Sequence, residues 1–155
     1  MGHYIQAIIA PQQVIDKVVP TIEGARGTSL GQGLAAIAIT GEVWDEIQQR
    51  PGVPCAVVPE GKLLRGSSSL YGLLAQVAAL GPAMYVETEY FGGVGDQYAV
   101  VAEDGNIVSF WEGDHPINEA LRRLGVEAEP GMDEFDTVGL GLYRSNEAMI
   151  AGAAG

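Results

Sequence analysis

Runs of apolar residues separated by turn residues predict both strands and helices along this chain. The clearest β pattern lies at residues 84–91, 97–103 and 106–111, which are rich in aromatic and β-branched side chains. Asp104-Gly105 separates the last two runs, and this dipeptide is typical of a tight type I′ hairpin because both turn residues adopt positive φ. We therefore expect an antiparallel meander over residues 84–111.

The N-terminal part of the chain combines further strands with loops. Residues 3–10 and 34–39 are apolar runs of strand length, and residues 55–58 and 62–65 are shorter runs that also predict strands. Residues 24–33 are rich in glycine and predict a flexible loop.

Apolar residues at helical spacing predict four helices, and two further segments predict single turns. The serines at 67–69 are suited to capping the third helix, because a serine side chain accepts hydrogen bonds from free backbone N–H groups. Proline or glycine follows three of the four helices and ends them. The predicted helices cover residues 11–19, 41–49, 70–80 and 116–124, and the single turns cover 133–138 and 145–150.

This order of elements predicts an α+β fold. We expect a mostly antiparallel sheet that includes the 84–111 meander, with four or five short helices packed against it. The chain has 155 residues, which favours one domain. We expect a single globular domain over residues 1–150, followed by a frayed tail over residues 151–155.

Charge is distributed unevenly between the two halves of the chain. Residues 1–86 contain six carboxylates and five Lys or Arg, a net charge of −1. Residues 87–155 contain fourteen carboxylates and three Arg, a net charge of −11, and the two halves sum to −12. A field of this sign repels nucleic acids and anionic membranes and attracts basic surfaces. The sequence therefore favours a basic protein as partner, and argues against a nucleic acid or a membrane.

The cysteine count and the N-terminus bear on the cellular compartment. The single cysteine, Cys55, rules out an internal disulfide and is typical of a reducing compartment. The N-terminus has no basic region of an export signal. The longest uncharged stretch, residues 66–86, is interrupted by Gly81-Pro82 and so predicts a helix and a strand instead of a membrane span. We expect a cytoplasmic protein, and the sequence does not indicate its oligomeric state.

The first hypothesis for function is a non-enzymatic acidic domain that binds a basic partner protein. Nuclease inhibitors and the immunity proteins of bacterial toxin systems are of this physical type: compact, strongly acidic and without a catalytic motif. Charge complementarity would speed association with such a partner and make it specific. The carboxylates expected to form the binding face decorate the hairpin region: Glu87, Glu89, Asp96, Glu103, Asp104, Glu112 and Asp114.

The second hypothesis is a small-molecule-binding protein or small enzyme with a pocket near residues 92–95. Glycines let a backbone approach a ligand closely, and neighbouring aromatic side chains would form a wall. An ordinary wide turn explains the same glycines. The candidate pocket residues are Tyr90, Gly92, Gly93, Gly95, Tyr98 and Arg144.

Motifs for catalysis, cofactors and metals are weak in this chain. Glu87 and Glu89 share one face of a strand, which fits an acid–base pair but also the solvated face of any strand. Cys55 with His115 is the thiol–imidazole combination worth testing, and a buried structural thiol explains Cys55 as well. The carboxylates at 112–114 and 133–136 lack a calcium-loop pattern. The sequence therefore favours a protein that is not an enzyme and needs no cofactor or metal.

A third class of function, a structural or oligomer-forming subunit, stays open. An exposed apolar patch on the helix over residues 70–80 would support it. The net charge is also explained by solubility alone, without any partner.

Overall fold

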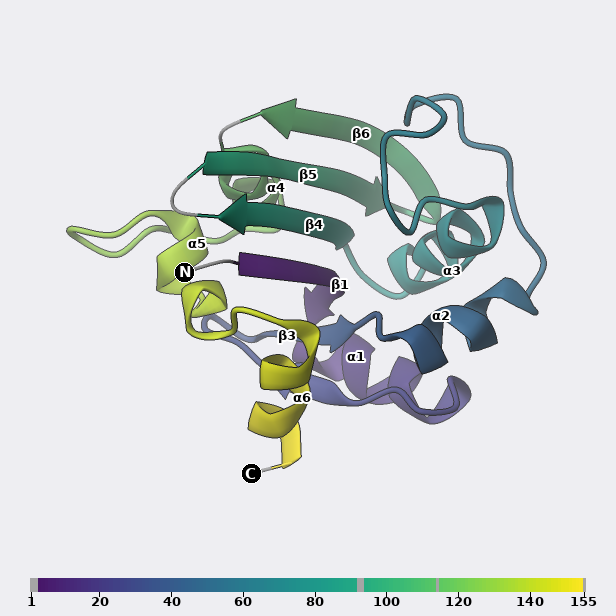
Figure 1. Cartoon of the computed structure of the whole chain (residues 1–155), viewed down its shortest axis with the longest axis horizontal. Helices are drawn as coiled ribbons and strands as arrows, with labels where there is room; N and C mark the ends of the chain where they lie inside the picture. The colour runs from purple at the N-terminus through teal and green to yellow at the C-terminus, as the bar shows by residue number, and fades with distance from the viewer. Residues whose placement is uncertain (1–2, 92–93, 114, 155) are drawn as a thin grey trace.

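The structure, a computed structural model, describes residues 3–91, 94–113 and 115–154 (Figure 1). Two of the predicted pocket residues, Gly92 and Gly93, and one predicted binding residue, Asp114, lie outside these ranges. Six strands are formed: β1 (His3–Pro11), β2 (Gly27–Ser29), β3 (Leu34–Ala38), β4 (Ala83–Phe91), β5 (Val94–Glu103) and β6 (Asn106–Gly113).

The six strands make one sheet in the order β2-β3-β1-β4-β5-β6, and every pairing in it is antiparallel. The predicted meander is confirmed, because β4, β5 and β6 pair in sequence. Asp104 and Gly105 form the predicted turn with φ of 52° and 80°, the positive values that a type I′ hairpin requires. The α+β fold predicted from the sequence is thus confirmed.

The helices lie in two groups along the chain, one before β4 and one after β6 (Figure 1). Ser67 caps α3 as predicted, since its Oγ accepts a hydrogen bond from the Leu70 N–H at 3.1 Å. The first group is α1 (Gln12–Val18), η1 (Val19–Thr21), α2 (Gly41–Gln48) and α3 (Ser68–Ala78); the second is α4 (Pro116–Arg123), α5 (Glu134–Thr137), η2 (Leu140–Leu142) and α6 (Asn146–Ala154).

Both faces of the sheet are covered. On the first face, Ile8, Tyr85 and Val100 pack against apolar residues of α1, α2 and α3. On the second face, Ile9 and Met84 pack against α4, η2 and α6. A strand buried on both sides needs apolar residues at consecutive positions, which is why β1 and β3 lack a polar–apolar alternation.

Three local predictions differ from the structure. Residues 55–58 and 62–65 are not strands, because they belong to the connection between α2 and α3, where Pro51, Pro54 and Pro59 remove backbone donors. The predicted loop at 24–33 contains the short strand β2. Helix α6 spans Asn146–Ala154.

The apolar stripe of α3 belongs to the core. Leu70, Leu73, Leu74 and Val77 are buried on the first face of the sheet, while Leu80, beyond the end of the helix, is 54% exposed. The patch that would have supported a structural subunit is therefore used within the chain. Among the described residues, no helix is long and apolar enough to cross a membrane.

His3 joins β1, β4 and η2 through buried hydrogen bonds on the second face. Its Nε2 lies 3.2 Å from the Leu140 carbonyl oxygen, which only accepts, so Nε2 carries the proton of the neutral ring. Its Nδ1 then accepts from the Thr88 hydroxyl at 2.7 Å, and Thr88 Oγ1 in turn accepts from the Ile5 N–H. Burial first, and the positive charge of Arg144 second, lower the pKa of His3 below its ordinary value of 6.5.

The lowered pKa of His3 predicts a loss of stability in mild acid. The unfolded chain, whose imidazole has the ordinary pKa, binds the proton more readily than the folded chain. The free energy of unfolding should therefore fall as pH drops below about 6.5 and level off below the folded-state pKa. Urea unfolding of wild type and His3→Gln at about pH 7.5 and about pH 5.5 checks this. An equal pH-dependent loss in both proteins would contradict it.

Candidate functional site

The carboxylates predicted to form one binding face are divided between two ends of the sheet. Glu89, Asp96 and Glu112 lie on the first face, near the end of the sheet where β4 leads into β5. Glu103 and Asp104 lie at the opposite end of β5, about 23 Å from Asp96 at the usual rise of a strand. Moreover, Glu103 is paired with Arg123 at 2.8 Å. The described members of this set therefore do not make a single surface.

Glu87 was predicted to be exposed, and this is wrong: its side chain is 5% exposed. One carboxylate oxygen accepts from the Leu64 N–H at 2.8 Å, and the other accepts from the Arg65 N–H at 2.9 Å. The second oxygen also accepts from the Tyr85 hydroxyl at 2.6 Å. The carboxylate thus satisfies two backbone donors that a neighbouring strand would otherwise bind.

The contacts of Glu87 hold the α2–α3 connection against the sheet. Burial first, and the charge of Glu87 second, raise the pKa of Tyr85 well above its usual value, so its hydroxyl stays a donor. Beside this anchor, the Arg65 guanidinium lies 5.3 Å from the centre of the Trp44 ring. The connection is therefore fixed at residues 64–65 from both β4 and α2.

Three carboxylates surround Tyr98 on the first face, and we call Glu89, Asp96, Tyr98 and Glu112 the Tyr98 surface. Glu89 lies directly opposite Asp96, and Tyr98 directly opposite Glu112, in neighbouring strands. Burial raises the pKa of Tyr98, with Asp96, Glu112 and Glu89 adding to the shift and Lys62 opposing it. All four charges thus act on one phenol.

Lys62, from the α2–α3 connection, is the cation at the Tyr98 surface. Its Nζ lies 3.1 Å from Glu112 Oε2, and both side chains are 45% exposed. Within the part of the chain that the structure describes, Glu89 and Asp96 form no ion pair. Glu112 is therefore paired, while the opposed carboxylates Glu89 and Asp96 are not, although Asp96 is close enough to Lys62 to help raise its pKa.

The pocket predicted near residues 92–95 is not assembled from its described members. Tyr90 lies on the second face, with its ring centre 6.3 Å from that of His3, whereas Tyr98 lies on the first face, 6.3 Å from Phe110. Arg144 is on the second face, close enough to His3 to act on its pKa. A Cβ at Gly95 would lie 1.8 Å from the Glu89 carbonyl oxygen, so this glycine is needed for strand pairing.

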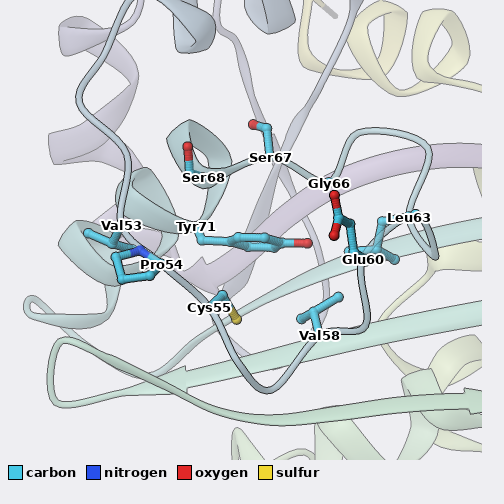
Figure 2. A pocket seen from close by; sticks show the side chains of 11 residues that line it. Val53, Pro54, Cys55, Val58, Glu60, Leu63, Gly66, Ser67, Ser68 and Tyr71 are labelled. Atoms are coloured by element: carbon cyan, nitrogen blue, oxygen red, sulfur yellow. The ribbon is translucent and has the colours of Figure 1, made fainter.

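A cavity of about 330 Å³ lies instead between the α2–α3 connection and the start of α3 (Figure 2). The predictions missed it because the connection was interpreted as two strands, although proline, glycine and serine between residues 51 and 69 signal irregular backbone. A second cavity, of about 250 Å³, lies on the other side of residues 53–55. The first is lined by Val53, Pro54, Cys55, Val58, Glu60, Gly61, Leu63, Gly66, Ser67, Ser68 and Tyr71.

The thiol–imidazole pair proposed from the sequence does not form. Cys55 lines both cavities on the first face. His115 is exposed at the start of α4, which packs on the second face. The two side chains therefore lie on opposite sides of the sheet.

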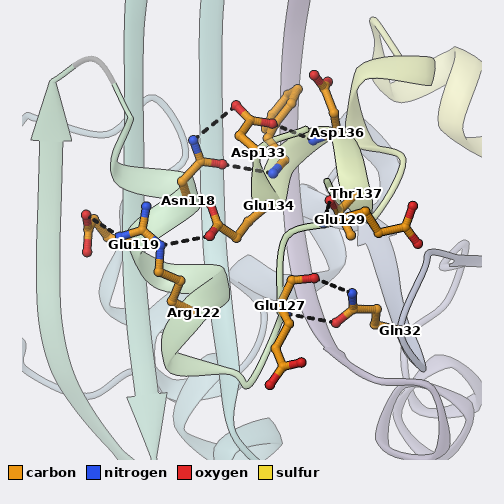
Figure 3. A network of polar contacts seen from close by, with 11 residues as sticks. Gln32, Asn118, Glu119, Arg122, Glu127, Glu129, Asp133, Glu134, Asp136 and Thr137 are labelled. Carbon is orange, nitrogen blue, oxygen red and sulfur yellow. Dashed lines mark hydrogen bonds and ion pairs between the residues drawn. The ribbon is translucent and has the colours of Figure 1, made fainter. Parts of the chain in front are cut away.

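The acidic segment at 133–136 is explained by structural contacts on the second face (Figure 3). Asp133 caps α5 by accepting from the Asp136 N–H, and it also accepts from the Asn118 amide. Glu134 pairs with Arg122 at 2.9 Å, and this hydrogen bond lowers the pKa of the Glu134 carboxyl. Among the described residues, no three His, Cys, Asp or Glu side chains group together in a way that could hold a metal.

Comparison with known proteins gives no match to a family model, a curated protein or a solved structure.

Replacing Glu87 with Gln should destabilise the fold and release the α2–α3 connection. A glutamine amide has one acceptor oxygen, so it cannot accept from the N–H groups of both Leu64 and Arg65 and from Tyr85. Leaving a buried donor unsatisfied should cost about 2–3 kcal/mol of unfolding free energy. Urea unfolding measures the loss, and hydrogen exchange at Leu64 and Arg65 locates it.

The matched control is Glu89→Gln, the same change two residues away on the same strand face, at an exposed side chain. We expect it to change the unfolding free energy by less than about 0.5 kcal/mol. Equal effects of the two substitutions would show that the Glu87 contacts do not anchor the connection.

Proposed function

We propose that the protein is a non-enzymatic domain that binds a basic partner protein through the Tyr98 surface, as inhibitor and immunity proteins bind theirs. The observation that carries this proposal is the opposed pair Glu89 and Asp96, which forms no ion pair among the described residues. The long-range field is the second support, because a net charge of −12 draws basic proteins toward the chain.

The two opposed carboxylates repel each other, and a cation bound between them would stabilise both. Side chains directly opposite each other in an antiparallel pair have Cβ atoms about 4.5–5.5 Å apart, and like charges at that distance destabilise the pairing. A Lys or Arg of a partner placed between Glu89 and Asp96 relieves this repulsion. Arg is favoured, since its planar guanidinium binds carboxylates in a bidentate manner and stacks on aromatic rings such as Tyr98.

Lys62 is a cation of the chain itself that competes with a partner's cation for the carboxylates of the Tyr98 surface. It already neutralises Glu112 at 3.1 Å. Removing its charge leaves Glu112 free and makes the local field more negative. The proposal therefore predicts opposite effects from substitutions of neighbouring residues: reversing Glu89 and Asp96 weakens binding, and removing the charge of Lys62 strengthens it.

The experiment is comparative affinity capture from the protein's own cells with four immobilised forms. These are wild type, Glu89→Lys/Asp96→Lys, Glu127→Lys/Glu129→Lys and Lys62→Gln. Glu127 and Glu129 are exposed carboxylates of the α4–α5 connection, so the third form makes the same change in net charge on the other side of the sheet (Figure 3). We expect one basic protein to be retained by every form except the second.

Affinity of the purified partner then supplies the quantitative check. Reversal at 89 and 96 should raise Kd by about tenfold or more, and the affinity of wild type should fall as salt screens the exposed charges beyond a Debye length of about 8 Å. Lys62→Gln should lower Kd. If both double variants lose the same amount of affinity, the partner responds to net charge alone. If Glu89→Lys/Asp96→Lys still retains the partner, the Tyr98 surface is not the binding site.

A further inference from the structure

The cavity beside α3 contains polar groups that the described part of the chain leaves without partners. The hydroxyls of Tyr71 and Ser68 make no hydrogen bond there, and the Glu60 carboxylate makes no ion pair. Figure 2 shows the Tyr71 ring in the middle of the cavity, with its hydroxyl directed to the end where Glu60 and Gly66 lie. Glu60 and Ser68 are exposed and Tyr71 is half-buried, so these unpaired groups are accessible to a ligand that enters the cavity.

Glycine at position 66 lets the Tyr71 hydroxyl reach this end of the cavity. A Cβ at Gly66 would lie 2.8 Å from that hydroxyl oxygen. Burial first, and proximity to Cys55 and Glu87 next, raise the pKa of Tyr71 to about 12. The phenol therefore stays neutral at physiological pH, able both to donate and to accept a hydrogen bond.

The charge of the residues that line the cavity is negative. None of the described residues that line it is Lys or Arg, while Glu60 contributes a full negative charge. The N-terminus of α3 also borders the cavity, but a helix terminus contributes only about half a positive charge, and Ser67 already binds the Leu70 N–H there. The cavity therefore favours a ligand with a positive charge, which the face of the Tyr71 ring can also attract.

The opposite end of the cavity is apolar. Val53 and Pro54 line it, on the side of the Tyr71 ring away from Glu60, while Val58 lies nearer Glu60 (Figure 2). A volume of about 330 Å³ is at the lower limit of the range in which proteins bind small organic ligands, roughly 300–1,000 Å³. The ligand therefore has a compact apolar body.

We propose that this cavity binds a small primary amine with a compact apolar body. The ammonium group hydrogen-bonds to the Glu60 carboxylate and the Tyr71 hydroxyl, and the apolar body lies along the Tyr71 ring toward Val53 and Pro54. This inference is independent of the Tyr98 surface and does not rest on the proposed binding of a basic protein.

The test uses three probes with the same phenyl-ethyl body: phenethylamine, phenethyl alcohol and hydrocinnamate. Titration of the isotope-labelled full chain, followed by NMR, gives both Kd and location. We expect phenethylamine alone to bind, with amide shifts centred on Cys55, Gly61 and Ser68. Glu60→Gln should weaken binding of the amine about tenfold or more, since the ammonium then meets a neutral amide oxygen in place of a charged carboxylate. Tyr71→Phe, which keeps the ring, should weaken it severalfold.

Glu89→Gln is the control that separates this cavity from the Tyr98 surface. It makes the same chemical change at an exposed carboxylate. It should leave the Kd of the amine unchanged and weaken binding of the basic partner protein. Equal binding of alcohol and amine, preferred binding of hydrocinnamate, or shifts centred on residues 89–98 would each overturn the proposal. So would the absence of any saturable shift with phenethylamine.

Discussion

The buried carboxylate of Glu87 is the interaction on which both candidate sites depend. It accepts three hydrogen bonds, two of them from backbone N–H groups of a connection that runs from residue 49 to residue 67. That connection has no strand or helix of its own in the described chain, so its own backbone contributes only a few turn and loop hydrogen bonds. A single acidic side chain in the middle of β4 takes over the role that a neighbouring strand would have.

The anchored residues lie between the two candidate sites. Two positions before Leu64, Lys62 reaches Glu112 at the Tyr98 surface. On either side of that lysine, Glu60, Leu63 and Gly66 line the cavity against α3. The backbone that Glu87 fixes therefore carries both the cation of one site and the carboxylate of the other. This is why the two sites lie close together on the first face, although their residues come from segments about thirty positions apart.

The sequence predicted the elements that local patterns determine and missed those that depend on distant contacts. The meander followed from apolar runs and Asp104-Gly105, because turn chemistry and strand propensity are local. Strand periodicity also placed Glu87 and Glu89 on the same face, correctly. It could not show that backbone from residues 64–65 covers one of them and leaves the other exposed. Tyr90 and Tyr98 were grouped because they flank the same glycines, but the strand register sends them to opposite faces.

The same distinction governs what the acidic half of the chain can do. Net charge fixes the sign of the long-range field, but Glu103, Glu112, Glu119 and Glu134 are each paired with a cation of the chain, and Glu87 is buried. These carboxylates contribute to the field and offer little to a partner in direct contact. Glu89 and Asp96 differ because the register of β4 and β5 sets them against each other. A partner's cation at this pair gains the attraction of both and removes their mutual repulsion, which an evenly spread charge of the same size would not provide.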